Sequence, residues 1–287
     1  MASLKEVKGR IASVNNTRKI TSAMKMVASA KLHKAQAAIE SMLPYERRLH
    51  HILTDFMSNC TEVTSPFIVK REVKKVAVVV FASNTSLCGG FNANVIRHLV
   101  DLLAEYKPLG LENILVFPVG KKVADAVRKL GFRIEGDFQH MADKPSYQEA
   151  ADLAADLMKR FLHGDVDKVE LLYNHFKSTA SQILTRETHL PIVLNNEKKE
   201  EERTIDYILE PSAEELMQEM LPKVLRMKMF TVLLDSNAAE HAARTMAMQI
   251  ATDNANELLQ ELTVMYNKSR QQSITNELLD IVGGSMA

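Results

Sequence analysis

A short turn of small and polar residues contains the side chains best suited to chemistry. It spans residues 83–92 (SNTSLCGGFN) and follows the apolar run at residues 73–82. In α/β proteins the turn after the first strand often binds a phosphate group. This turn matches neither G-x-G-x-x-G nor G-x-x-x-x-G-K-S/T, and no P-loop lysine follows Gly89 and Gly90. A structural tight turn is therefore favoured over a phosphate site.

The other reactive side chains form no recognisable catalytic or metal-binding pattern. Cys88 would need a neighbouring base to act as a nucleophile, and the sequence indicates none. His50 and His51 are adjacent, so they cannot face each other on a helix, and the remaining histidines lack metal-ligand spacing. The acidic pairs at 201–202 and 214–215 fit a solvated loop and the first turn of a helix. We expect no catalytic residue, no metal and no cofactor.

A polar interval near the C-terminus is a candidate contact site. Residues 267–273 (NKSRQQS) are all polar, and seven helical residues cover every face over about two turns. Apolar residues at coiled-coil spacing flank the interval: Leu258, Leu262 and Met265 before it, and Ile274, Leu278 and Ile281 after it. The pattern alone leaves open a polar contact site or a gap filled by solvent.

Long helices at both ends of the chain must position these segments. Residues 10–43 and residues 223–282 contain neither proline nor glycine. The second stretch would form a helix of about 90 Å at 1.5 Å per residue. Coiled-coil spacing starts at Leu4 in the first helix and is broken at residues 15–19, and residues 45–56 continue as an amphipathic helix after Pro44.

Charge is distributed unevenly along a chain whose formal net charge is zero. Residues 1–48 contain ten Lys and Arg against three Asp and Glu, whereas residues 211–287 contain six against ten. A basic first helix and an acidic last helix would attract each other as an antiparallel pair. Residues 1–44 contain no Phe, Tyr or Trp, which argues against stacking on nucleic acid.

The middle of the chain alternates between strand and helix patterns. We expect strands at 73–82, 113–119, 169–173 and 183–190, and helices at 92–106, 121–130 and 146–162. The last of these helices would begin with a capping box formed by Ser146 and Glu149. The alternation predicts an α/β fold: a Rossmann-like, mostly parallel sheet covered on both faces.

These patterns divide the chain into three parts. An N-terminal coiled-coil helix is expected at 1–60, a central α/β domain at 70–210, and a C-terminal coiled-coil helix at 211–287. Residues 195–203 read as a solvated loop, and Ser212 would cap the last helix.

Cysteine use and hydropathy restrict where such a protein works. Cys60 and Cys88 are the only cysteines, and two unpaired thiols fit a reducing compartment. Charges from Lys5 onward do not fit a signal peptide, and the longest apolar run, residues 76–82, is too short to cross a membrane. We expect other subunits to hold the protein at any membrane where it acts.

Several segments carry a specific resemblance to one family. They include the first helix, the turn with Leu87-Cys88-Gly89-Gly90 and three C-terminal runs. These lie at residues 11–21, 23–27, 87–90, 252–255, 266–271 and 274–282. Over essentially its whole length the chain resembles the gamma subunit of the rotary F-type ATP synthase.

The resemblance implies a rotor without a catalytic site or cofactor of its own. The terminal helices would form an antiparallel coiled coil inside a ring of three alpha and three beta subunits. Rotation of this asymmetric shaft would couple ion flow to ATP synthesis or hydrolysis. The central domain would meet the epsilon subunit and the c-ring, at the cytoplasmic face of the bacterial inner membrane. No nucleic acid partner and no membrane span are implied.

The resemblance also assigns roles to particular residues. Arg270 and Gln271 match positions that contact a loop of one beta subunit. Positions used for coupling rotation to catalysis are matched by Met24, Arg244, Thr275 and Glu277. Residues 84–86 (NTS) depart from the Asp-Arg-Gly that is frequent in the family, so no contact is assigned to them.

Two rival readings stay open at this point. A coiled-coil adaptor with an α/β binding module would explain the long helices and the charge distribution, but not the C-terminal runs. A nucleotide-binding enzyme built on the central domain would need the phosphate-loop lysine and acid–base pairs that the sequence lacks.

Overall fold

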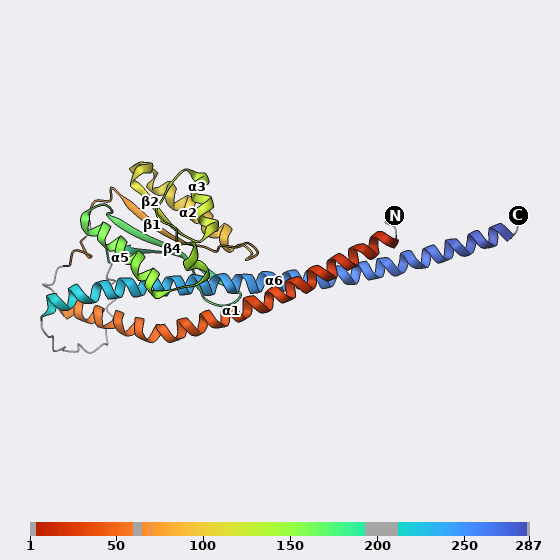
Figure 1. Cartoon of the computed structure of the whole chain (residues 1–287), viewed down its shortest axis with the longest axis horizontal. Helices are drawn as coiled ribbons and strands as arrows, with labels where there is room; N and C mark the ends of the chain where they lie inside the picture. The colour runs from red at the N-terminus through yellow and green to blue at the C-terminus, as the bar shows by residue number, and fades with distance from the viewer. Residues whose placement is uncertain (1–3, 60–64, 70, 193–211, 286–287) are drawn as a thin grey trace.

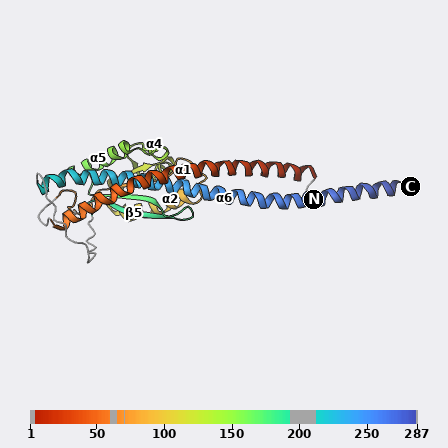
Figure 2. The ribbon, with the colours of Figure 1, turned by 90° about the horizontal axis from the view of Figure 1, so that it is seen from below.

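Two long helices and one α/β domain make up the molecule (Figure 1). A computed structural model describes residues 4–59, 65–69, 71–192 and 212–285. Helix α1 (Leu4–Asn59) and helix α6 (Ala213–Ser285) run antiparallel, so that the two termini lie at the same end of the molecule. The domain lies beside the opposite half of this pair, and the paired helices project far beyond it in both views (Figure 2).

Contacts along the two helices confirm the predicted antiparallel pairing. Thr21 and Thr252 bring their hydroxyl oxygens within 2.9 Å, and Arg18 Nη1 donates to Asn256 Oδ1 at 3.4 Å. Closer to the domain, small and aliphatic side chains form a buried cluster between the helices: Leu32, Ala35, Ala238 and Ala242. The chain direction follows from these pairs, because residue numbers rise on one helix as they fall on the other.

Helix α1 is continuous through residues 15–19 and through Pro44. The predicted helix after Pro44 is therefore confirmed as part of one long element. Proline has no N–H to donate to the carbonyl oxygen four residues earlier, which here belongs to Glu40. Packing on both sides of Pro44 compensates for that lost hydrogen bond, since Ile39, Met42 and Leu49 all pack against the main core.

The central domain contains a five-stranded sheet in the order β3-β2-β1-β4-β5. The strands are β1 (Val76–Phe81), β2 (Ile114–Val119), β3 (Arg133–Ile134), β4 (Lys168–Phe176) and β5 (Gln182–Leu190). The β1–β2, β1–β4 and β2–β3 pairs are parallel, and only β5 is antiparallel to its neighbour β4. The prediction of a mostly parallel, Rossmann-like sheet is confirmed.

Helices cover both faces of the sheet, which explains why β1 is apolar throughout. Val76, Val78 and Val80 face helices α2 (Phe91–Tyr106) and α3 (Lys121–Leu130). Ala77 and Val79 face the other layer, formed by α4 (Gln139–Asp143), α5 (Tyr147–His163) and the first half of α6. A parallel strand buried on both faces needs a continuous apolar run.

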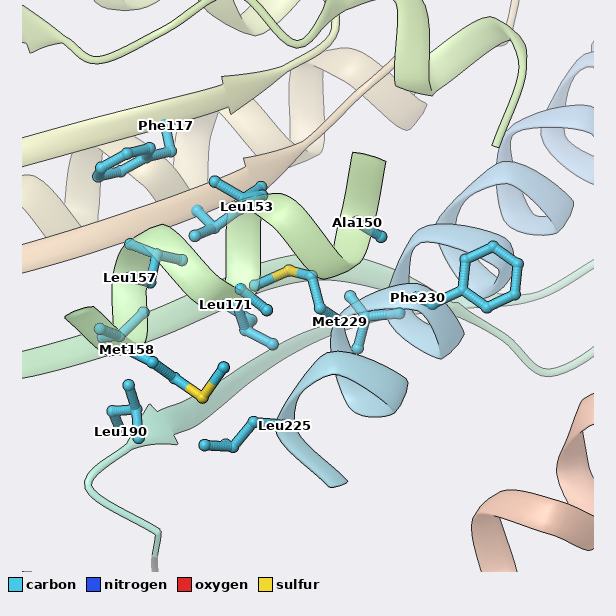
Figure 3. Close-up of a cluster of buried hydrophobic side chains, with 14 of the residues drawn as sticks. Phe117, Ala150, Leu153, Leu157, Met158, Leu171, Leu190, Leu225, Met229 and Phe230 are labelled. Atoms are coloured by element: carbon cyan, nitrogen blue, oxygen red, sulfur yellow. The ribbon is translucent and has the colours of Figure 1, made fainter. Parts of the chain in front are cut away.

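The long helix α6 contributes directly to the core of the domain. Its residues Leu225, Met229 and Phe230 pack among side chains of α5, β4 and β5 (Figure 3). Burying one such side chain contributes about 1.5–3 kcal/mol. The start of α6 is therefore both a helix of the shaft and a layer of the domain, and the two parts cannot separate without exposing this core.

Three details differ from the sequence-based expectations. Strand β3 and helix α4 were not predicted, because elements of two and five residues are too short to show a period. The Ser146 cap makes no side-chain hydrogen bond, and Glu149 instead contacts His140 Nδ1 at 3.2 Å, so the predicted capping box is wrong. The first strand begins at Val76, after three residues of its predicted range.

The start of the last helix agrees with the expected cap. Glu215 N donates to Ser212 Oγ at 3.3 Å. The predicted loop at residues 195–203 and the thiol of Cys60 lie outside the described residues.

Candidate functional site

The carboxyl ends of β1 and β4 are where this kind of sheet would bind a ligand. The chain leaves β1 toward β2 and β3 and later returns to β4 on the other side of β1. Open α/β sheets bind ligands in the crevice at such a switch of direction. Here α6 fills that place: its Ala239 and Ala243 pack against Cys88 and Phe91 of the β1–α2 turn.

Small side chains allow the turn to approach α6 closely. Gly89 has φ +58°, a left-handed conformation that favours glycine. A Cβ atom at Gly89 would lie 3.8 Å from the Cβ of Ala247 on α6. The turn is thus a packing element of the shaft, in agreement with the predicted structural tight turn.

Side chains within the turn bind one another. Asn92 Nδ2 donates to Ser83 Oγ at 2.8 Å and to the sulfur of Cys88 at 3.1 Å. Cys88 is buried, and its polar neighbours are Ser83, Asn92 and the carbonyl of Thr85, none of which is a base. This arrangement offers no activated nucleophile.

Asn84 holds three segments of the domain together, a role that the sequence did not reveal. Its Nδ2 donates to the carbonyl of Gln139 at 2.8 Å, and its Oδ1 accepts from the backbone N–H of Lys121 at 2.8 Å. The side chain therefore joins the β1–α2 turn to α4 and to the start of α3. An asparagine amide can do this because it donates and accepts at the same time.

Arg244 links α6 to the same turn. Its Nη1 donates to Glu240 Oε1 at 2.6 Å, and its Nη2 donates to Thr85 Oγ1 at 2.8 Å. The side chains of Arg244 and Glu240 are only 12% and 8% exposed. Breaking a buried pair by removing one partner costs about 3–5 kcal/mol, because the other charge is left without compensation.

The surroundings of this ion pair shift the titration of two groups. Burial raises the pKa of the Glu240 carboxyl, while Arg244 acts in the opposite direction; Asp143 of α4 raises it further and Lys31 of α1 lowers it. Burial, followed by Arg244 and Lys31, lowers the pKa of His241 to about 4. His241 is therefore neutral near pH 7.

A second link joins α6 to the end of β4. Asp235 Oδ2 lies 2.6 Å from His175 Nδ1, and Asp235 Oδ1 accepts from the backbone N–H of Phe176 at 2.8 Å. Sequence reasoning missed Asp235 and Glu240. The only signal for them was that they are polar residues in a stretch rich in alanine, where a helix contacts other backbone closely.

The site residues implied by the resemblance do not converge in one place. Arg270, Gln271, Thr275 and Glu277 are all exposed along the free end of α6. Thr275 Oγ1 donates to the carbonyl of Gln271, which is a local bond within the helix. Met24 lies half-buried on α1. Arg244, by contrast, is engaged with its own chain.

The C-terminal end of α6 has no partner in the described part of α1. Extrapolated one residue at a time from the Thr21–Thr252 contact, Leu4 lies opposite roughly residue 270. Beyond that point the side chains of Ile274, Leu278 and Ile281 are 49%, 57% and 68% exposed. The second predicted apolar seam is therefore exposed in this chain, and apolar surface of this kind marks an interaction site.

Within residues 4–59, 65–69, 71–192 and 212–285, no group of three or more His, Cys, Asp or Glu is placed to hold a metal ion. None of the described helices combines the length and the hydropathy needed to cross a membrane.

Fold and site together define a class of protein: a coiled-coil shaft with a docked α/β domain whose ligand crevice is filled by the shaft itself. Exposed large apolar side chains include Ile274, Leu278 and Ile281 at the free end of α6, and others lie on α1 and on the domain.

Comparisons with known proteins identify the family. A family model described as ATP synthase matches residues 3–287. The chain is 81% identical to the ATP synthase gamma chain of Phocaeicola vulgatus and 63% identical to that of Bacteroides thetaiotaomicron, with all of both chains covered in each case. The chain belongs to the ATP synthase gamma chain family.

Solved structures of low sequence identity share the fold. The rotor of the Euglena gracilis mitochondrial ATP synthase matches with a TM-score of 0.62 at 19% identity, covering 94% of this chain and 98% of that one. The central stalk and c-ring structure from Tetrahymena thermophila matches with a TM-score of 0.59 at 21% identity, covering 81% and 99%.

Proposed function

We propose that this chain is the central rotor shaft of an F-type ATP synthase. It would couple ion-driven rotation of a membrane ring to ATP synthesis or hydrolysis in a hexamer of alpha and beta subunits. The observation that carries the proposal is the exposed apolar end of α6, which extends past its helical partner. Full-length relatives named ATP synthase gamma chain support it.

The geometry suits the transmission of torque. Helix α6 is continuous over 73 residues, a length of about 110 Å. The start of the helix packs in the domain core and its far end extends beyond α1. A rotation applied at the domain is therefore transmitted to the far end along one helix. At the free end α6 extends past α1, which gives the inserted part of the shaft the asymmetry that sequential action on three equivalent sites requires.

The partners follow from this role. The exposed end of α6 would enter the ring of three alpha and three beta subunits, and the central domain would meet the epsilon subunit and the c-ring. Solved relatives of the fold include a central stalk with its c-ring. We place the protein at the cytoplasmic face of the bacterial inner membrane, as a peripheral subunit held there by its partners.

We also propose roles for particular residues and a division of the chain into three parts. Arg270 and Gln271 would contact a beta-subunit loop, and Met24, Thr275 and Glu277 would take part in coupling. The exposure of Arg270, Gln271, Thr275 and Glu277 supports contact with a partner. The parts at 1–60, 70–210 and 211–287 describe the chain, with the start of the third serving also as a core helix of the second.

Copurification with the hexamer tests the proposal. The chain is co-expressed with the alpha and beta subunits as wild type, as Leu278→Ser with Ile281→Ser, and as Val100→Ser with Leu130→Ser, which alters exposed apolar residues of the domain. Wild type and the domain variant should copurify with the hexamer, and the α6 variant should be lost from it. Equal recovery of both variants, or failure of the wild type to copurify, would argue against a shaft inserted by its C-terminal end.

The nucleotide-binding alternative has its own test. Because α6 fills the crevice at β1 and β4, the isolated chain should bind no ATP at concentrations where nucleotide enzymes saturate. Saturable binding in equilibrium dialysis would favour the enzyme reading instead.

A further inference from the structure

Arg244 faces its own chain rather than open solvent, and this changes the role that it can play. We propose that Arg244 is a positioning residue: from α6 it holds the β1–α2 turn at one place on the shaft, so that the turn and the shaft move as one body. This inference rests on the rotor function proposed above. A residue that couples through direct contact with the hexamer would need its guanidinium free, and here that group is engaged on two sides.

The guanidinium is held in place before it reaches the turn. Glu240, one helical turn earlier on α6, accepts from Nη1 at 2.6 Å and is itself buried. Because this pair lies on a single helix, it fixes the direction of the remaining donor. That donor, Nη2, reaches Thr85 Oγ1 at 2.8 Å. The fork of arginine donors suits this task, because two bonds leave the same rigid plane.

Few other contacts tie the tip of the turn to the shaft. Hydrogen bonds among Ser83, Cys88 and Asn92 shape the turn internally but do not reach α6. The packing partners on α6 are alanines, which offer little area and no direction. The Arg244–Thr85 bond is therefore the directional contact that selects one position of the turn.

The docked turn adds apolar surface to the shaft. Leu87 has φ 69°, an uncommon value for a residue with a branched side chain, and is 57% exposed. Ala247, beside Gly89, is followed along α6 by the exposed Ile250 and preceded by the exposed Met246. Leu87 keeps a constant position relative to these two side chains only while the turn stays docked. A rotor must present the same surface to each of its stator sites, so this position has to stay constant.

Amide hydrogen exchange gives the first test. Thr85→Val removes the acceptor for Arg244, keeps the shape of the side chain and leaves the Arg244–Glu240 pair intact. One hydrogen bond to a charged group is worth a factor of about ten to a hundred in the population of the open turn. Amides of residues 86–90 in the assembled complex should exchange faster by about that factor. Thr263→Val is the matched control, because the Thr263 hydroxyl donates to the carbonyl of Leu259 on its own helix.

A designed tether gives the second test. In a background with Cys60→Ser and Cys88→Ala, Gly89→Cys and Ala247→Cys place two thiols at the ends of a 3.8 Å Cβ separation, which matches the mean for disulfides. Oxidation joins the two sulfurs and releases two protons and two electrons to an added oxidant such as oxidised glutathione. Bond formation is checked by mass spectrometry, and its formation despite the left-handed φ of +58° at Gly89 would support the docked geometry.

Rescue separates positioning from direct contact. Thr85→Val, and Arg244→Gln combined with Glu240→Gln, should both lower the number of protons pumped per ATP in the reconstituted complex. The oxidised tether should restore pumping in both, and reduction should remove the rescue. If the tether restores slow exchange but not pumping, Arg244 acts on a partner directly and the inference is overturned.

A wrong rotor function and a wrong role for Arg244 would give different results. If neither the unmodified chain nor the chain with Cys60→Ser and Cys88→Ala assembles with alpha and beta subunits, the proposed rotor function is wrong. If both assemble and hydrolyse ATP, but Thr85→Val changes neither exchange nor pumping, only the positioning role of Arg244 is wrong.

Discussion

The hydroxyl oxygens of Thr21 and Thr252 lie 2.9 Å apart across the interface between α1 and α6. Thr21 is almost fully buried there. Each hydroxyl also lies within hydrogen-bonding distance of a carbonyl on its own helix, at 3.0 Å from that of Arg18 for Thr21 and at 2.7 Å from that of Met248 for Thr252. The contact between the two hydroxyls is an additional bond that forms in one register of the helices, and it therefore favours the register in which α6 extends beyond α1.

This contact predicts that the double variant loses less stability than the two single variants added together. Thr21→Val alone should destabilise the chain by about 1 kcal/mol, because it leaves the hydroxyl of the half-buried Thr252 with one partner fewer. Thr21→Val combined with Thr252→Val should recover part of that loss, since both polar groups are then absent. Urea unfolding of the two single variants and the double variant measures the coupling. Strictly additive effects would mean that the two hydroxyls do not interact.

The buried carboxyl of Glu240 predicts a dependence of stability on pH. Its pKa is raised in the folded chain above the ordinary value of 4.5, so the folded state holds the proton more tightly than the unfolded state. The contribution of Glu240 to stability is therefore complete below the ordinary pKa and is lost as the pH rises through the folded pKa. Glu240→Gln keeps an acceptor for Arg244 and removes this loss.

Denaturant unfolding of wild type and Glu240→Gln at a series of pH values checks this prediction. The variant should gain relative to wild type as the pH rises above 4.5. Glu257→Gln, at an exposed position of α6, is the control and should show no such trend. A difference between Glu240→Gln and wild type that is constant with pH would show that burial of the charge does not govern this site.

His189 predicts the opposite slope on the acid side. It is buried on β5, no partner for its Nε2 is found among the described residues, and burial followed by Lys228 lowers its pKa to about 3. Its contribution is present above the ordinary value of 6.5 and is lost as the pH falls toward 3. His189→Met should therefore raise stability and flatten the acid limb of the profile, whereas the exposed His33→Met should not. An unchanged acid limb in His189→Met would assign acid sensitivity to other groups.

Arg270 and Gln271 should matter to the complex but not to the folding of the chain. Both are exposed on the part of α6 beyond α1, so alanine there removes no internal contact and slightly favours the helix. If they bond a charged group of a beta subunit at one angle of rotation, losing a bond worth about 1.5–3 kcal/mol changes a step rate by about ten- to a hundredfold. Assembly, ATPase rate and pumping per ATP in the reconstituted double variant test this. Normal values for all three would leave the polar interval as solvated helix.

Much of the fold was predictable because its signals are local. The apolar run that became β1 is buried on both faces, and breaker-free stretches became the two long helices. The helix predicted at residues 121–130 has these bounds in the structure, where Gly131 ends it in the left-handed conformation with φ 78°. Local patterns fail where tertiary contacts decide, as at Glu149, which is drawn to His140 instead of the cap.

The candidate sites depended on information that a local pattern does not contain. The resemblance grouped Arg244 with exposed coupling positions, but its burial against Thr85 arises from the docking of two segments 159 residues apart. The apolar residues around Leu278 have the spacing of a packed coiled coil. They are exposed because α1 does not reach this far along α6. The relative reach of two helices is set by their register, which a residue pair such as Thr21 and Thr252 fixes only after folding.

Observation of rotation in single complexes tests the central claim most directly. Lys129→Cys places a label on an exposed position of α3, far from the shaft's free end. With the alpha and beta subunits fixed to a surface and a bead attached at this position, ATP should drive stepwise rotation in one direction, with three main dwells per turn. A complex that hydrolyses ATP at its full rate while the bead fluctuates about one angle would contradict the account.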